Sequence, residues 1–122
     1  MIHQIAPQFF TTDIPATLAW YRDKLGFECV GAAGDPPFYA IVARDDHAIH
    51  FRCAEPPTPI PDKYAEEFLD AYIRVADADA LHAEFAVNGV EFARDLGNMP
   101  WNTREFVIKD CGGRLLCFGA NL

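Results

Sequence analysis

A helix is predicted from the stretch Asp13-Ile14-Pro15-Ala16-Thr17-Leu18-Ala19-Trp20-Tyr21-Arg22-Asp23-Lys24-Leu25-Gly26. Asp13 is a favourable N-cap, and Pro15 is tolerated in the first turn of a helix. Apolar side chains recur at helical spacing at Ile14, Leu18, Tyr21 and Leu25. Lys24 suits the last turn, and Gly26 suits the C-terminal cap. A helix of about three turns therefore follows the first short apolar segment.

Strand-like runs flank this helix on both sides. The run Ile5–Thr12 precedes it and is short, apolar and rich in β-forming residues. Three more runs follow it, at Phe27–Ala32, Phe38–Arg44 and Ala48–Cys53. Turn residues separate these runs, at positions 34–37 and at Asp45-Asp46. The first part of the chain therefore predicts a βαβββ unit.

The same order of elements returns after the proline-rich segment Glu55–Asp62, which can be neither helix nor central strand. Phe68–Val75 predicts a strand, and Asp77 or Asp79 predicts the start of a second helix. Ala78, Leu81 and Phe85 form its apolar stripe, and Gly89 follows as a cap. Further strands are expected at Val90–Ala93, Arg104–Lys109 and Leu115–Gly119.

The two halves match at nearly constant offsets. The helix starts Asp13 and Asp77 lie 64 residues apart, and Gly26-Phe27-Glu28 matches Gly89-Val90-Glu91 at 63. The closing strands match at 67, with Ile49-His50-Phe51 against Leu116-Cys117-Phe118. Repetition of this kind predicts two βαβββ modules in one α+β domain. We expect a single domain over residues 1–122, with a first module at 1–54, a linker at 55–66 and a second module at 67–122.

Composition excludes several classes of protein. The chain has 122 residues, 51% of them hydrophobic, and a formal net charge of −8. Such an acidic chain is a poor partner for nucleic acid or for an anionic membrane surface. No apolar run is long enough for a membrane span, and the N-terminus lacks the features of a signal peptide. We therefore expect a cytoplasmic protein whose cysteines are thiols.

The sequence resembles the vicinal oxygen chelate superfamily, which includes glyoxalases, bleomycin-resistance proteins and dioxygenases. The resemblance is carried by residues 6–13, by Trp20-Tyr21-Arg22-Asp23-Lys24-Leu25-Gly26-Phe27, by Ile73-Arg74-Val75 and by Pro100-Trp101 with Arg104-Glu105-Phe106. It is closest to the bleomycin-resistance branch, and it departs from the family pattern at Asn102, Cys111 and Gly112. It implies two modules that form a curved mixed sheet with a central cleft, usually in a homodimer.

The resemblance also implies four positions at which superfamily enzymes hold a divalent metal ion. Counted from the helix starts and from the repeat, these positions fall on Ala6, His50, Asp70 and Cys117. Ala6 has no donor atom, and cysteine stands where the enzymes use glutamate. His47 cannot assist, because residues three apart on a strand point to opposite faces. We therefore predict no metal cofactor; the alternative is one divalent ion bound by His50, Asp70 and Cys117.

A cleft of this family would be lined by aromatic and polar side chains. The predicted ligand-binding residues are His50, Asp70, Tyr72, Trp101, Arg104, Phe106 and Cys117. Such walls suit a planar or amphipathic organic molecule, and an acidic rim favours a cationic one. No catalytic residue is assigned: serine is absent, and a buried Cys117 would be inert.

Three functions remain open from the sequence. The first is a homodimeric protein that binds a small organic molecule without metal and without covalent change. The second is a metal-dependent lyase, isomerase or dioxygenase of the glyoxalase or extradiol type. The third is a module that binds another protein through an exposed apolar patch.

Overall fold

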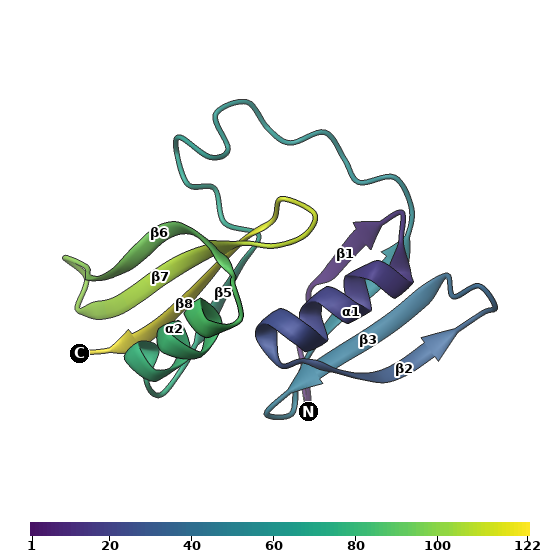
Figure 1. Ribbon diagram of the computed structural model, residues 1–122, viewed down its shortest axis with the longest axis horizontal. Coiled ribbons are helices and arrows are strands. Elements are labelled where there is room, and N and C mark those ends of the chain that lie inside the picture. The colour runs from purple at the N-terminus through teal and green to yellow at the C-terminus, as the bar shows by residue number, and fades with distance from the viewer. The chain divides into compact units, whose positions relative to one another are not determined.

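A computed structural model describes residues 1–122 and divides the chain into two compact units, Met1–Thr58 and Pro59–Leu122 (Figure 1). Each unit contains one helix and one four-stranded mixed sheet. The element order is βαβββ in both units, which confirms the predicted α+β fold built from two modules. No helix combines the length and the apolar character that a membrane span requires.

The first unit contains the elements β1 (Gln8–Thr11), α1 (Ile14–Leu25), β2 (Glu28–Ala33), β3 (Tyr39–Arg44) and β4 (His47–Cys53). Its strands are ordered β1-β4-β3-β2. β1 runs parallel to β4, and the other neighbouring strands are antiparallel. The crossover that a parallel pair requires is supplied by α1 and the strands that follow it.

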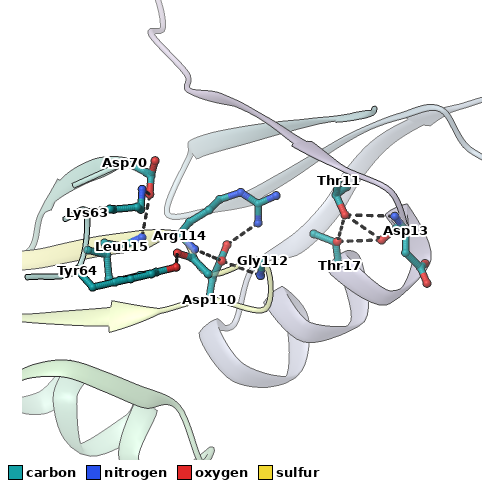
Figure 2. A network of polar contacts seen from close by, with 11 residues as sticks. Thr11, Asp13, Thr17, Lys63, Tyr64, Asp70, Asp110, Gly112, Arg114 and Leu115 are labelled. Carbon is teal, nitrogen blue, oxygen red and sulfur yellow. Dashed lines mark hydrogen bonds and ion pairs between the residues drawn. The ribbon is translucent and has the colours of Figure 1, made fainter. Parts of the chain in front are cut away.

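Both ends of α1 are capped as the sequence predicts. Asp13 accepts a hydrogen bond from the backbone N–H of Ala16 at 2.9 Å, and Gly26 adopts a left-handed conformation at φ 71°. The buried side chains of α1 are Ile14, Thr17, Tyr21 and Leu25. The Thr17 hydroxyl lies 2.8 Å from that of Thr11 and donates to the carbonyl oxygen of Asp13, so its polar group is satisfied (Figure 2).

The second unit contains β5 (Ala71–Arg74), α2 (Ala78–Val87), β6 (Glu91–Asn98), β7 (Thr103–Lys109) and β8 (Leu115–Asn121). Its strand order, β5-β8-β7-β6, repeats that of the first unit. Asp77, not Asp79, is the N-cap of α2 and accepts from the N–H of Ala80 at 3.0 Å. Phe85 on α2 packs edge to face against Phe106 on β7 and Phe118 on β8.

Two strands differ from their predicted lengths. β6 runs on to Asn98, past the expected end at Ala93, because irregularities in its register with β7 on either side of Arg94 let it continue. β5 begins at Ala71, not at Phe68. Residues 61–67 form turns instead, which are fixed to the β7–β8 hairpin.

The attachment of these turns is visible in Figure 2. The Tyr64 hydroxyl donates to the carbonyl oxygen of Gly113 at 2.8 Å. Asp70 accepts from the backbone N–H of Leu115 at 2.9 Å and forms an ion pair with Lys63. The second half of the connecting segment is therefore anchored to the unit that follows it.

Candidate functional site

Each sheet has one face that packs on its own helix and one that points away from it. In the first unit Phe51 and Ala40 are buried, and the Phe51 ring lies 5.0 Å from that of Tyr21 on α1. Side chains alternate along a strand, so their neighbours in the sequence point the other way. This second surface, the α1-distal face, comprises Gln8 and Phe10 on β1, Tyr39 and Ile41 on β3, and His50 and Arg52 on β4.

Hydrogen bonds order the polar part of the α1-distal face. The amide Nε2 of Gln8 donates to the Tyr39 hydroxyl at 3.0 Å. The same hydroxyl lies 2.8 Å from Nδ1 of His50. The side chain of His50 is half-buried, whereas Arg52, two residues further along β4, is exposed. The imidazole is thus held by one of its two nitrogens.

The second unit has a corresponding surface, the α2-distal face. It comprises Tyr72 and Arg74 on β5, Glu105 and Val107 on β7, and Cys117 and Gly119 on β8. Strand register pairs Tyr72 with Cys117 as it pairs Gln8 with His50. The offsets of 64 and 67 residues found in the sequence therefore relate positions that are equivalent in the two sheets.

A buried carboxylate dominates the α2-distal face. Glu105 is only 2% exposed, and its oxygens accept from the Tyr72 hydroxyl at 3.0 Å, the Thr103 hydroxyl at 2.9 Å and Nη2 of Arg94 at 2.9 Å. Burial raises the pKa of Glu105, but these hydrogen bonds and one from Trp101 together hold its pKa below the ordinary value. Glu105 is therefore charged at neutral pH.

Arg94 extends this network to the connecting segment. Its guanidinium donates to both carboxylate oxygens of Glu67, at 2.9 and 3.0 Å, as well as to Glu105. Hydrogen bonding to Glu67 is the main cause of the raised pKa of Arg94. Bidentate pairs of this kind are among the stronger and more directional polar contacts in proteins. Two carboxylates thus share one guanidinium.

Cys117 lies beside Glu105 and is buried with Val107 and Leu115. Burial raises the pKa of its thiol to about 12, and the neighbouring Glu105 charge acts in the same direction. Burial, with hydrogen bonding to Glu105, also raises the pKa of Tyr72. Both groups keep their protons at neutral pH, so Cys117 is a poor nucleophile.

The structure brings three of the predicted site residues together. Tyr72 and Cys117 share the α2-distal face, and Trp101, in the turn between β6 and β7, helps to lower the pKa of Glu105 on that face. His50 occupies the equivalent place on the α1-distal face.

Two predicted site residues point to the opposite surface of the second sheet. Phe106 is fully buried against Phe85 of α2, and Arg104 forms a bidentate ion pair with Asp79 at 2.9 and 3.0 Å. Strand alternation places both on the face that packs on α2. They do not join Tyr72 and Cys117.

The predicted metal positions Ala6 and Asp70 lie two residues before Gln8 and Tyr72 in the sequence. The residues directly beside His50 and Cys117 are Gln8 and Tyr72. Asp70 already accepts from the Leu115 N–H and pairs with Lys63. Within either unit, no three side chains of histidine, cysteine, aspartate or glutamate are placed to hold a metal ion.

Several residues of these faces were not predicted. Glu105 could have been found, because alternation from a core-facing Phe106 puts it on the distal face. Gln8 could have been found from Tyr72 by the repeat. No local pattern predicts the contact between Arg94 and Glu67, which lie 27 residues apart and meet through the irregular strand β6.

The family of the chain follows from a comparison with family models. Residues 1–118 match the model described as the Glyoxalase/Bleomycin resistance protein/Dioxygenase superfamily. The chain belongs to this superfamily. The match confirms the resemblance found in the sequence. No curated protein matches the sequence significantly.

Three solved structures have the same fold as this chain. A glyoxalase-related enzyme from Clostridium phytofermentans is 23% identical with a TM-score of 0.77, covering 100% of this chain and 97% of its own. TioX from Micromonospora sp. ML1 is 17% identical with a TM-score of 0.79, covering 98% and 99%. The bleomycin-binding protein of Streptomyces verticillus, in complex with copper(II)-bleomycin, is 27% identical with a TM-score of 0.74, covering 100% and 98%.

Proposed function

We propose that this superfamily member binds a small, planar, cationic organic molecule at the α2-distal face, without metal and without covalent change. The observation that carries the proposal is the pair of aromatic side chains at the buried Glu105 carboxylate. Tyr72 and Trp101 are 44% and 62% exposed; the Tyr72 hydroxyl donates to Glu105, and Trp101 helps to lower the pKa of Glu105. Aromatic faces attract cations and stack on planar molecules, and the hydrogen bond that fixes the Tyr72 ring reduces the entropy lost on binding.

The contacts of the Tyr72 ring support a cationic ligand. Glu67 and Glu105 share the guanidinium of Arg94, and the guanidinium of Arg74 balances the second carboxylate, so a cationic ligand would take the place of Arg74 at the ring. The guanidinium carbon of Arg74 already lies 5.4 Å from the centroid of the Tyr72 ring. The net charge of −8 acts in the same direction over longer distances.

The superfamily also supports a binding role. The Streptomyces verticillus protein, at 27% identity, is a bleomycin-binding protein with copper(II)-bleomycin bound to it. That protein illustrates the class of function, a small organic ligand held by this fold. The ligand proposed for the present chain is defined by its planarity and positive charge, not by the name of that drug.

The side chains at the superfamily's metal positions do not fit a divalent ion. Ala6 has no donor atom, and Cys117 supplies a soft sulfur atom where the superfamily enzymes use a glutamate oxygen. Asp70 is engaged by the Leu115 N–H and by Lys63. These contacts support binding without a metal over the metal-dependent lyase, isomerase or dioxygenase. Elemental mass spectrometry on untagged protein, with His50→Ala as the control, tests this part: about one metal ion per chain, lost in the variant, would contradict it.

We further propose that the protein works as a homodimer in the cytoplasm. In each sheet the outer strands, β1 and β2 or β5 and β6, have a backbone edge with no partner in that sheet. Cys29, Cys53 and Cys111 are exposed free thiols, which are typical of a reducing compartment. Light scattering of the purified chain tests the dimer, since a monomer at micromolar concentration would contradict it.

Ligand binding can be read from Trp101 in a Trp20→Phe variant, which leaves one tryptophan in the chain. We expect ethidium, a planar cation, to change the fluorescence of Trp101 in a saturable way, and neutral acridone of similar size to bind at least about tenfold more weakly. Tyr72→Ala should weaken ethidium binding by about tenfold.

The matched control is Val87→Ser, at an exposed position of α2 in the same unit. It should leave the affinity for ethidium unchanged. Equal binding of ethidium and acridone, or an unchanged affinity in Tyr72→Ala, would contradict the proposal. Copper(II)-bleomycin and metal-free bleomycin, titrated in the same way, report whether that drug is a ligand.

A further inference from the structure

The α1-distal face carries two donor groups side by side. His50 and Arg52 lie two residues apart on β4 and therefore project from the same face of the sheet. Their cross-strand neighbours in the ladder are Gln8 and Ile41 for His50, and Phe10 and Tyr39 for Arg52. None of these four neighbours is acidic. An anionic group placed here would meet two donors and no adjacent carboxylate.

The hydrogen bonds of this face bear on which imidazole nitrogen carries the proton. Gln8 donates to the Tyr39 oxygen, and the same hydroxyl lies 2.8 Å from Nδ1 of His50, to which it can donate its phenolic proton. A neutral imidazole that accepts at Nδ1 carries its own proton at Nε2. With Tyr39 as the donor, His50 presents an N–H donor at Nε2.

Arg52 supplies the second donor. Its side chain is exposed, and a guanidinium has five N–H donors in a planar fork that matches a carboxylate. Phe10 and Ile41 are half-buried apolar side chains on the same face. The face thus combines a fork for an oxyanion with apolar surface for the rest of an organic molecule.

We infer that the α1-distal face binds the carboxylate of a small organic molecule. The Nε2–H of His50 and the guanidinium of Arg52 donate to its oxygens, and Phe10 and Ile41 contact its apolar part. Tyr39 and Gln8 are positioning residues, which fix the proton and the orientation of His50. This site lies in the first unit, whereas the cation site proposed at Tyr72 and Trp101 lies in the second unit. The two proposals do not depend on each other.

Nuclear magnetic resonance of the full-length chain tests this inference with benzoate as the probe and benzamide as its neutral analogue. Long-range proton–nitrogen spectra of the imidazole should show the Nε2–H form of neutral His50. Benzoate should shift the His50 signals in a saturable way, and benzamide should bind at least about tenfold more weakly. Arg52→Gln should weaken benzoate binding by about tenfold or more.

Two further variants test whether Tyr39 acts by orienting His50 and whether the loss of any exposed arginine weakens benzoate binding. Tyr39→Phe should release the Nδ1 restraint, so that both neutral tautomers of His50 appear and benzoate binds more weakly. Arg22→Gln makes the same charge change at an exposed site on α1 and should leave benzoate binding unchanged.

A proton on Nδ1 of His50, equal binding of benzoate and benzamide, or an unaltered benzoate affinity in Arg52→Gln would overturn the inference. The ethidium signal of Trp101 is recorded separately. A failure of either site is thus distinguished from a failure of the other.

Discussion

The two distal faces occupy equivalent positions in two sheets of the same topology, yet they hold different chemistry. Where the first unit has His50, Arg52 and Tyr39, the second has Cys117, Gly119 and Glu105. An amide, a hydroxyl and an imidazole make a chain of hydrogen bonds on the first face. A buried carboxylate with an arginine organises the second. The repeated fold therefore sets which strand positions are neighbours. The residues at those positions decide whether the contact between them includes an ion pair.

The difference in charge can be tested most strongly by removing Arg94. Arg94→Leu leaves Glu105 buried with one donor fewer and leaves Glu67 without its partner. We expect the free energy of unfolding to fall by about 3 kcal/mol, the range found when one member of a buried ion pair is removed. Chemical denaturation followed by circular dichroism measures it.

Arg22→Leu is the control, since its ion pair with Asp23 lies on the surface of α1. It should leave stability unchanged, because such pairs contribute little. An equal effect of the two substitutions would mean that the Glu105 network does not stabilise the second unit.

The positions of Arg52 and Gly119 offer a second contrast. A methyl group at Gly119 would overlap the Tyr72 hydroxyl and come within 3.1 Å of a Glu105 oxygen. Gly119→Ala should therefore lower the free energy of unfolding by about 2 kcal/mol, as overpacking does. Arg52→Ala, at the equivalent but exposed position, should change it by no more than about 0.5 kcal/mol. If both substitutions are tolerated, the close packing of Tyr72 on Gly119 is not required for stability.

Acid should affect the second face through Glu105. Its pKa is lowered in the folded chain, so the unfolded chain takes up this proton at a higher pH than the folded one. The contribution of Glu105 is present above its ordinary pKa of 4.5 and is lost as the pH falls through its folded value. In melting curves between about pH 3 and pH 7, Glu105→Gln should lose less stability than the original chain at the acid end. Parallel curves for the two proteins would contradict this assignment.

The smallest expected effect concerns thiol reactivity. The pKa of Cys117 is about 12, so almost none of it is thiolate at neutral pH, whereas Cys29, Cys53 and Cys111 are exposed. Iodoacetamide followed by mass spectrometry should label these three in the folded chain and label Cys117 only after unfolding. Cys117→His, which copies the residue of the first face, should leave the labelling of the other three unchanged. Rapid labelling of Cys117 in the folded chain would show that this face opens to solvent.

The fold could be predicted from the sequence because its signals are local and repeated. Asp13 and Asp77 accept the capping hydrogen bonds expected of them, and Gly26 and Gly89 take up positive φ values at the helix ends. Helix caps depend on a few neighbouring residues, which a sequence shows directly. Strand bounds depend on more than local residues: β6 continues through irregularities of register with β7 that no residue pattern predicts.

The site could be predicted only in part. The repeat predicts that His50 and Cys117 are equivalent, and strand register agrees with that equivalence; Tyr72, predicted only as a residue of the cleft, lies beside Cys117. Phe106 was expected to line a cleft, yet it packs on α2, because a single-residue step along a strand reverses the face. Counting residues back from a helix start gave Ala6 and Asp70 as the positions on the first strand of each module. It could not show that strand register places Gln8 and Tyr72, two residues later, beside His50 and Cys117.

The sequence by itself determined the two βαβββ modules, their helix caps and the acidic character of the chain, since these depend on neighbouring residues and on composition. The tertiary structure decided which groups share protons and charge. Tyr39 meets His50 across two strands, and Arg94 joins Glu67 to Glu105 over separations of 27 and 11 residues. Contacts of this kind depend on strand register and on the path of a connecting segment, which the whole packed chain sets and no short stretch encodes.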